Sequence, residues 1–206
     1  MSIHFHPLRV KKIQKETADC VSVQFDIPES LTESFQFKQG QSLTMPTIIN
    51  GEEVRRTYSI CSSPSDKKLQ VAIKKAAGGI FSTFANKELK QNDILEVMQP
   101  VGKFYVELNP ANKKNYLGIA AGSGITPLIS IIKTTLQTEP RSSFTLLYGN
   151  KTRSSIIFFE ELEGLKNKYL QRFNFINVLS RERTDSTINF GRINTEKLIE
   201  LQKLID

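Results

Sequence analysis

In the first half of the chain, apolar and polar positions alternate in short runs rich in β-branched residues, which is typical of β-strands. Turn-forming residues bound these runs. Asn50-Gly51 is the strongest hairpin signal, because both residues tolerate positive φ. Six strands at this spacing, interrupted by one short helix over Ser82–Leu89, predict an antiparallel barrel. The predicted strands are Leu8–Lys15, Cys20–Ile27, Ser42–Ile49, Arg55–Ser62, Leu69–Lys75 and Ile94–Met98.

The pattern changes after the polar segment 109–114, where strands begin to alternate with longer helices. This predicts βαβ units and a parallel sheet. We therefore expect two domains, an antiparallel β-barrel over 1–109 and an α/β parallel-sheet domain over 110–206. Three parallel strands leave an apolar face poorly covered and an edge open, so we expect a C-terminally truncated piece of a longer protein. The predicted strands are Tyr116–Ala121, Phe144–Tyr148 and Phe173–Leu179, and the predicted helices are Pro127–Gln137, Ile156–Tyr169 and Thr195–Leu204.

Composition and charge narrow the function classes. The 206 residues carry a net charge of +7, but the lysines and arginines are spread along the chain without a nucleic-acid-binding motif. Bound phosphates and an acidic redox partner explain this charge better than nucleic acid does. No apolar run reaches the roughly 20 residues that span a bilayer, and the N-terminus lacks the layout of a signal peptide. We expect a cytoplasmic protein that binds neither nucleic acid nor membrane.

The two cysteines, Cys20 and Cys61, lie in predicted strands, which favours buried reduced thiols over a disulfide. They cannot supply the four thiolates of an iron–sulfur cluster, so any such cluster must belong to another chain or to a missing part of this one. No cluster of histidine, cysteine and carboxylate residues has metal-ligand spacing, and we expect no metal site.

The segment Arg56-Thr57-Tyr58-Ser59 places a cation, an aromatic ring and hydroxyls in one strand. Side chains alternate along a strand, so Arg56 and Tyr58 share one face, while Thr57 and Ser59 share the other. A guanidinium suits a pyrophosphate, and a tyrosine ring suits stacking beside a flavin. The Ser59 hydroxyl can hydrogen-bond the edge of a ring lying across the strand. The alternative is an ordinary half-exposed strand.

A glycine-rich loop, Gly78 to Thr83, leads into the short helix. Its glycines let the backbone approach a ligand closely, and Ser82 or Thr83 is expected to cap the helix. A helix N-terminus is also a ready anion site, suitable for a cofactor pyrophosphate. The alternative is a hairpin loop followed by a capped helix with no ligand.

A second glycine loop, Gly122 to Pro127, joins a strand to a helix in the second domain. It departs from the Gly-x-Gly-x-x-Gly pattern, because Pro127 stands at the third glycine position, and the next strand ends in Tyr148-Gly149-Asn150 without an acidic residue for a ribose. We expect Thr126 as N-cap and Pro127 at the first helical position. This loop predicts a phosphate or nicotinamide surface; the alternative is a simple strand-to-helix connection.

After the third strand, Ser180-Arg181 comes at the carboxyl end of a parallel sheet, where open α/β sheets bind ligands. A serine followed by an arginine suits a 2′-phosphate and favours NADPH over NADH. The alternative is a solvated charged loop.

Together these motifs resemble the ferredoxin–NADP reductase superfamily. The resemblance rests on their order along the chain: Arg56-Thr57-Tyr58-Ser59, then Gly79-Ile80-Phe81-Ser82, then Gly122-Ser123-Gly124-Ile125-Thr126-Pro127. Within that superfamily, Gly78–Asn86, Tyr148-Gly149-Asn150 and Gly191-Arg192-Ile193 are similar to the reductase components of phenylacetyl-CoA oxygenase (epoxidase) systems.

The resemblance implies FAD on a Greek-key barrel, NADPH or NADH on the α/β domain, and hydride transfer from nicotinamide to flavin. It implies Ser59 and Thr126 as the catalytic positions. The implied cofactor-binding residues are Arg56, Thr57, Tyr58, Ser59, Ile73, Lys74, Gly79, Ile80, Phe81, Ser82, Gly122, Ser123, Gly124, Thr126, Pro127, Ser180 and Arg181.

The implied function is a flavin-dependent oxidoreductase that passes electrons from NAD(P)H through FAD to a [2Fe–2S] domain or an oxygenase partner. The sequence departs from the family in lacking the Cys-Gly-Pro strand beside the nicotinamide and the four-cysteine [2Fe–2S] domain. The alternatives are a stand-alone flavin reductase or diaphorase, and a non-catalytic FAD-binding fragment.

Overall fold

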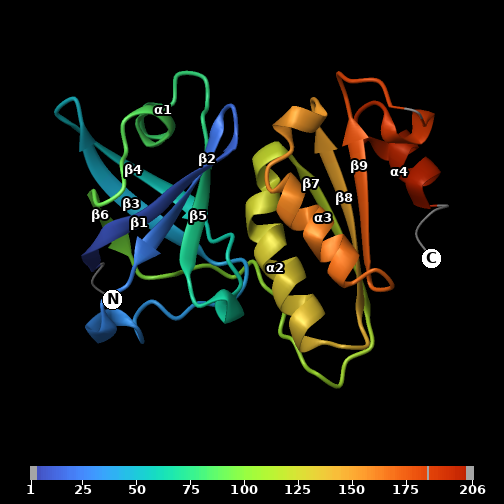
Figure 1. Ribbon diagram of the computed structural model, residues 1–206, viewed down its shortest axis with the longest axis horizontal. Helices are drawn as coiled ribbons and strands as arrows, with labels where there is room; N and C mark the ends of the chain where they lie inside the picture. Colours follow the sequence, from blue (N-terminus) through green and yellow to red (C-terminus); the bar gives the residue numbers. More distant parts are fainter. Residues whose placement is uncertain (1–3, 185, 203–206) are drawn as a thin grey trace. The chain divides into compact units, whose positions relative to one another are not determined.

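The computed structural model describes residues 4–184 and 186–202, which form two compact units (Figure 1). The first unit runs to Glu107 and includes Thr126–Thr134, and the second holds Leu108–Ile125 and continues from Thr135. Nine strands, four α-helices and five short 3₁₀ helices make up the regular structure of the described part of the chain.

The first unit contains an antiparallel barrel of six strands. One sheet has the order β5-β2-β1-β6, and β3 and β4 form a hairpin. Two single bridges, Ser42 to Val101 and Ile60 to Val71, continue the pairing beyond these two sheets. Because β2 pairs with β5, and β6 with β1, the connections follow a Greek key rather than a simple meander, as expected. The strands are β1 (Phe5–Thr17), β2 (Cys20–Asp26), β3 (Ser42–Ile49), β4 (Glu52–Ser59), β5 (Leu69–Lys74) and β6 (Ile94–Met98).

Alternation between buried and exposed positions along these strands builds the barrel core. Leu8 and Val10 of β1, for example, are fully buried while the intervening Arg9 is exposed. At the tip of the β3–β4 hairpin, Asn50 and Gly51 both adopt positive φ, of 52° and 80°, which confirms the predicted turn. The helix α1 (Ile80–Lys87) covers one part of the barrel and contributes the buried Phe81 and Ala85 to its core.

The second unit is built on a parallel sheet of three strands in the order β7-β8-β9, namely β7 (Asn115–Ala121), β8 (Ser143–Asn150) and β9 (Phe173–Leu179). The helix α3 (Phe159–Lys168) packs on β9, and α4 (Thr195–Gln202) buries Leu201 against a cluster that includes Ile176 (Figure 1). The edge strand β7 leaves Leu117 and Ile119 exposed, as expected of so narrow a sheet.

Several predicted helix boundaries were wrong. The helix α1 begins at Ile80 rather than Ser82, and α2 (Ile125–Thr138) begins two residues before the predicted start. The helix α3 begins three residues later than predicted, because Phe158 adopts a left-handed conformation with φ of 62°. The last two residues of the predicted C-terminal helix, 203 and 204, lie outside the described residues.

Cys20 and Cys61 are both buried and form no disulfide, which confirms the prediction of reduced thiols. Burial and the nearby Glu16 and Asp19 carboxylates raise the pKa of Cys20 to about 12. Within the described ranges, no helix is both long and apolar enough to cross a bilayer.

Candidate functional site

In the first unit, β4 and the start of α1 bring two predicted motifs together. The ring of Tyr58 packs on the ring of Phe81, with centroids 5.5 Å apart and planes inclined by 34°. Burial raises the pKa of Tyr58, although the neighbouring Arg56 charge acts in the opposite direction. Tyr58 therefore stays neutral at physiological pH and presents a half-buried aromatic surface suited to stacking.

Arg56 lies on the same strand and is exposed. Its guanidinium Nη1 donates to the Arg55 carbonyl at 2.8 Å. No carboxylate of residues 4–184 and 186–202 lies within ion-pair distance of Arg56. Its charge is therefore not neutralised by a side chain, and a planar guanidinium of this kind suits a pyrophosphate.

The two hydroxyl residues of the same segment have different surroundings. Thr57 is already engaged, because its hydroxyl lies 2.8 Å from that of Thr44 across the hairpin. Ser59 ends β4 opposite Ser42 and is half-buried. Of the two, Ser59 is better placed to contact a ligand at the strand end.

The loop before α1 departs from the predicted capping. Gly79 is the N-cap and makes no side-chain cap, while Ser82 is the third residue of the helix. The Ser82 hydroxyl instead accepts from the Ala76 N–H at 3.1 Å and donates to the Gly79 carbonyl at 3.3 Å. A Cβ at Gly79 would overlap Ser82 Oγ. An alanine at this position would therefore push the Ser82 hydroxyl out of these two hydrogen bonds. The helix N-terminus keeps first-turn amides for an anion.

The other predicted FAD residues of the first unit differ in exposure. Ile73 is fully buried and its carbonyl accepts from Asn86 Nδ2 at 3.0 Å, so its side chain belongs to the core. Phe81 is also buried, whereas Ile80 is exposed. Lys74 is half-buried, with its Nζ 3.6 Å from Asp19. Ile80 and Lys74 are therefore the two of these four that present side chains to solvent.

In the second unit, Gly122, Ser123 and Gly124 form a 3₁₀ turn at the end of β7. Gly122 has a φ of 51°, and its carbonyl accepts a hydrogen bond from the Tyr148 hydroxyl at 2.8 Å. Ser123 and Gly124 are exposed. The glycine loop is thus held at its base by β8 and open at its tip.

The predicted capping of α2 was wrong. The 3₁₀ turn continues directly into the helix, so Gly124 is the N-cap, and Thr126 and Pro127 are its second and third residues. Proline is tolerated there because the first amides of a helix have no helical acceptor. Thr126 is buried and Pro127 half-buried.

Ser180 and Arg181 follow β9, at the carboxyl edge of the sheet, beside the end of β8. The Ser180 N–H donates to the Asn150 carbonyl at 2.9 Å, and the Arg181 N–H donates to the Lys151 carbonyl at 2.9 Å. The Arg181 side chain is exposed and has no carboxylate partner among the described residues. Its backbone is thus fixed while its charge points to solvent.

One residue at this edge was given no role by the sequence. Asn150 is only 7% exposed, yet neither its Oδ1 nor its Nδ2 has a hydrogen-bond partner among the described residues. Buried polar groups are nearly always paired, so an amide of this kind at the carboxyl end of a strand is a candidate to be satisfied by a ligand or an ordered water. No sequence signal distinguishes it from a paired asparagine.

Both halves of the chain match known oxidoreductase domains. Residues 7–105 match the oxidoreductase FAD-binding domain, and residues 119–205 match the oxidoreductase NAD-binding domain. The chain therefore belongs to the ferredoxin reductase family and carries one domain for each cofactor.

Curated proteins of two oxygenase systems are similar to this chain. It is 47% identical to a subunit of the 1,2-phenylacetyl-CoA epoxidase of Escherichia coli, over 96% of this chain and 55% of that protein. It is 36% identical to the ferredoxin reductase component of a 3-ketosteroid-9-alpha-monooxygenase from Rhodococcus rhodochrous, over 84% of this chain and 48% of that protein. The chain thus spans about half the length of the curated relatives it matches.

Solved structures share the fold. The CS-b5R domains of human Ncb5or in the NAD+ form match with a TM-score of 0.82 and 26% identity, over 98% of this chain and 59% of that one. A ferredoxin NADP+ reductase from Neisseria gonorrhoeae with bound FAD and NADP matches with a TM-score of 0.76 and 22% identity, over 97% of this chain and 76% of that one. The predicted fold class is confirmed.

Proposed function

We propose that this chain is the flavin and pyridine-nucleotide portion of an NAD(P)H-dependent reductase that delivers electrons to a [2Fe–2S] domain or an oxygenase partner. The 47% identity to an epoxidase component over nearly the whole chain is the observation that carries the proposal. We place the activity in the cytoplasm, where NAD(P)H is available, and in the catabolism of phenylacetyl-CoA.

Bound FAD would supply hydride acceptance from NAD(P)H and release of electrons one at a time. The chain's own residues would bind and orient it. In this proposal Arg56 and the first turn of α1 hold the pyrophosphate, and Tyr58 stacks beside the flavin ring. The Ser59 hydroxyl hydrogen-bonds the ring edge.

The pyridine nucleotide would occupy the carboxyl edge of the β7-β8-β9 sheet. Gly122–Gly124 would let the backbone approach it closely, with Thr126 and Pro127 near the nicotinamide. Ser180 and Arg181 would contact the adenosine phosphate. An exposed arginine without a carboxylate partner among the described residues favours NADPH, which carries the additional phosphate, over NADH.

A reductive titration tests the proposal. The purified protein, reconstituted with FAD, should lose its flavin absorbance near 450 nm on anaerobic mixing with NADPH. Bleaching by neither NADPH nor NADH would contradict the oxidoreductase function and leave a flavin-binding fragment. The variant Arg56→Ala should retain less FAD after gel filtration, whereas Arg55→Ala, the neighbouring exposed arginine on the opposite face of β4, should retain as much as the parent. Equal retention by both variants would contradict the assignment of Arg56.

Nucleotide choice is tested separately. Arg181→Ala should raise KM for NADPH at least tenfold and leave KM for NADH within about twofold, because loss of one charged hydrogen bond costs about 1.5–3 kcal/mol. Equal effects on both nucleotides would contradict a contact with the 2′-phosphate.

A further inference from the structure

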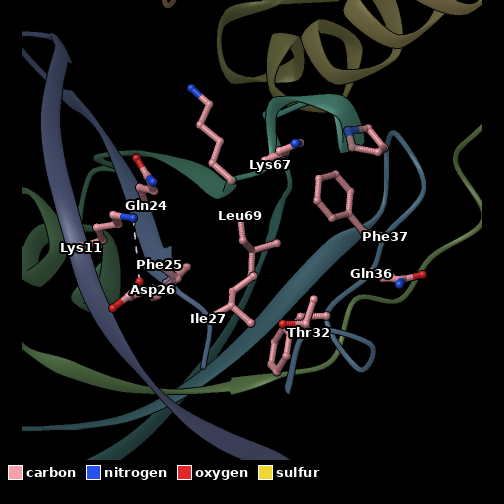
Figure 2. A pocket seen from close by; sticks show the side chains of 13 residues that line it. Lys11, Gln24, Phe25, Asp26, Ile27, Thr32, Gln36, Phe37, Lys67 and Leu69 are labelled. Atoms are coloured by element: carbon pink, nitrogen blue, oxygen red, sulfur yellow. Dashed lines mark ion pairs between the residues drawn. The ribbon is translucent and has the colours of Figure 1, made fainter. Parts of the chain in front are cut away.

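The first unit contains a pocket of about 610 Å³ that none of the residues assigned above lines. Its walls come from the middle of β1, from the end of β2, from the segment 32–37 and from the turn that leads into β5 (Figure 2). Leu69, at the start of β5, lies in this pocket, whereas Ile73 and Lys74 end the same strand. The pocket and the predicted FAD residues of β5 are therefore at opposite ends of that strand.

The floor of the pocket is apolar and partly aromatic. Phe25 and Phe35 are 2% exposed and Leu69 is fully buried, while the rings of the lining also include the half-buried Phe37. Figure 2 shows Leu69 and Ile27 in the centre of the pocket with the Phe37 ring beside them. Of these residues, Phe37 and Ile27 keep accessible apolar area, and a ring or a short hydrocarbon body that covers it gains binding energy from its burial.

The rim of the pocket is basic. Lys11, Lys67 and Lys68 line it together with a single carboxylate, that of Asp26. Three lysines against one aspartate give the lining a formal charge of +2. Asp26 is moreover already paired with Arg9, and lies 3.8 Å from Lys11. The pocket therefore favours an anion.

Lys67 and Lys68 account for most of the positive charge that makes the pocket favour an anion. No carboxylate of the described ranges lies within ion-pair distance of either lysine. The adjacent Asp66 does not neutralise them, because it accepts from the Ser63 N–H at 2.9 Å and pairs with Lys133, also of the first unit. That capping box fixes the turn, and Lys67 follows it in a left-handed conformation with φ of 51°.

From this combination we infer a second ligand site in the first unit, one that binds an aromatic carboxylate or a similar organic monoanion. Its rings lie against the half-buried Phe37 and Ile27, with Leu69 packed beneath them, and its anionic group lies at the rim against Lys67 and Lys68. Charge alone would suit inorganic phosphate and the apolar floor alone would suit a neutral arene; the site requires both features in one molecule.

Isothermal titration calorimetry on the FAD-saturated protein tests this inference with 2-naphthoate as the probe. Inorganic phosphate supplies charge without rings, and 2-naphthol supplies rings without a carboxylate. We expect 2-naphthoate to bind at least tenfold more tightly than either. Absence of 2-naphthoate binding, or equal binding of 2-naphthol or phosphate, would overturn the inference.

Variants locate the site. The double variant Lys67→Glu/Lys68→Glu should weaken 2-naphthoate binding at least tenfold. The control Lys113→Glu/Lys114→Glu reverses a tandem pair of exposed lysines in the second unit and changes the net charge equally. It should leave binding within twofold. FAD occupancy and thermal midpoint should be unchanged in both, which shows that folding is retained.

A bulky neutral substitution blocks the pocket without changing its charge. Thr32→Trp places a large side chain at an exposed position of the lining and should also abolish 2-naphthoate binding. Parent-like binding in either Lys67→Glu/Lys68→Glu or Thr32→Trp would overturn the assignment to this pocket.

Discussion

Replacement of Glu139 should destabilise the second unit, because this carboxylate is buried at the end of α2. It is 0% exposed and accepts four hydrogen bonds. The donors are the Asn109 N–H at 3.0 Å, Asn112 Nδ2 at 2.7 Å, the Tyr116 hydroxyl at 3.0 Å and the Ser142 hydroxyl at 2.7 Å. The carboxylate therefore connects the segment before β7, β7 itself and the turn before β8.

The magnitude follows from those four bonds. In Glu139→Gln the side chain keeps its volume, and one oxygen still accepts from the two N–H donors. The two hydroxyls must instead accept from the new amide, and all four bonds lose their charge assistance. A loss of about 0.5 kcal/mol per bond gives about 2 kcal/mol. Glu139→Ala removes all four acceptors and should cost about 3–5 kcal/mol, since it leaves the donors without a partner.

The pH dependence provides a second test. Burial raises the pKa of Glu139, but the hydrogen bonds from Asn109, Asn112, Ser142 and Tyr116 outweigh it, so the pKa lies below the ordinary value of 4.5. Between the folded-state pKa and 4.5, this carboxyl group is ionised in the folded protein and largely protonated in the unfolded chain, so unfolding takes up a proton. The stabilisation is complete above that value and is lost as the pH falls through the folded-state pKa.

Urea unfolding followed by far-UV circular dichroism, at pH 7 and again below pH 4.5, measures both effects. Glu139→Gln should be less stable than the parent at pH 7, and the difference should shrink at the lower pH. An exposed position elsewhere in the second unit gives the control, Gln171→Glu, which should change stability by less than about 0.5 kcal/mol. Parent-like stability of Glu139→Gln at pH 7, or a difference independent of pH, would refute the argument.

Three further outcomes are expected. Gly79→Ala should lower FAD affinity about tenfold or more, because the new Cβ displaces the loop before α1; Gly164→Ala, in open space within α3, should leave FAD binding unchanged and raise stability by about 0.5–1 kcal/mol. Asn150→Leu should raise the thermal midpoint or leave it unchanged but increase KM for NAD(P)H, and an unchanged KM would remove Asn150 from the nucleotide site. Cys20 should react with iodoacetamide at pH 8 only after denaturation, since burial keeps it a thiol; rapid labelling of the native protein, read by mass spectrometry, would contradict its pKa of about 12.

The sequence by itself predicted the barrel strands and the parallel sheet closely, because both depend on local alternation and on turn residues. The strands Ser42–Ile49, Ile94–Met98 and Phe173–Leu179 occur with the predicted bounds. The Asn50-Gly51 turn was predicted for the same reason, since positive φ is a property of those two residues. The motifs also predicted the two cofactors, because glycine loops and charged strand ends are contiguous in the chain.

Only the tertiary structure decided features that depend on contacts between distant residues. The helix α1 begins at Ile80, so Gly79 is its N-cap instead of Ser82 or Thr83, and the Ser82 hydroxyl accepts from the Ala76 N–H. The missing partners of Asn150 among the described residues, and the clustering of Lys67 and Lys68 with aromatic rings from other segments, likewise have no local signal. Alternation and turn chemistry are properties of neighbours in the chain, whereas burial, pairing and pocket lining are set by packing.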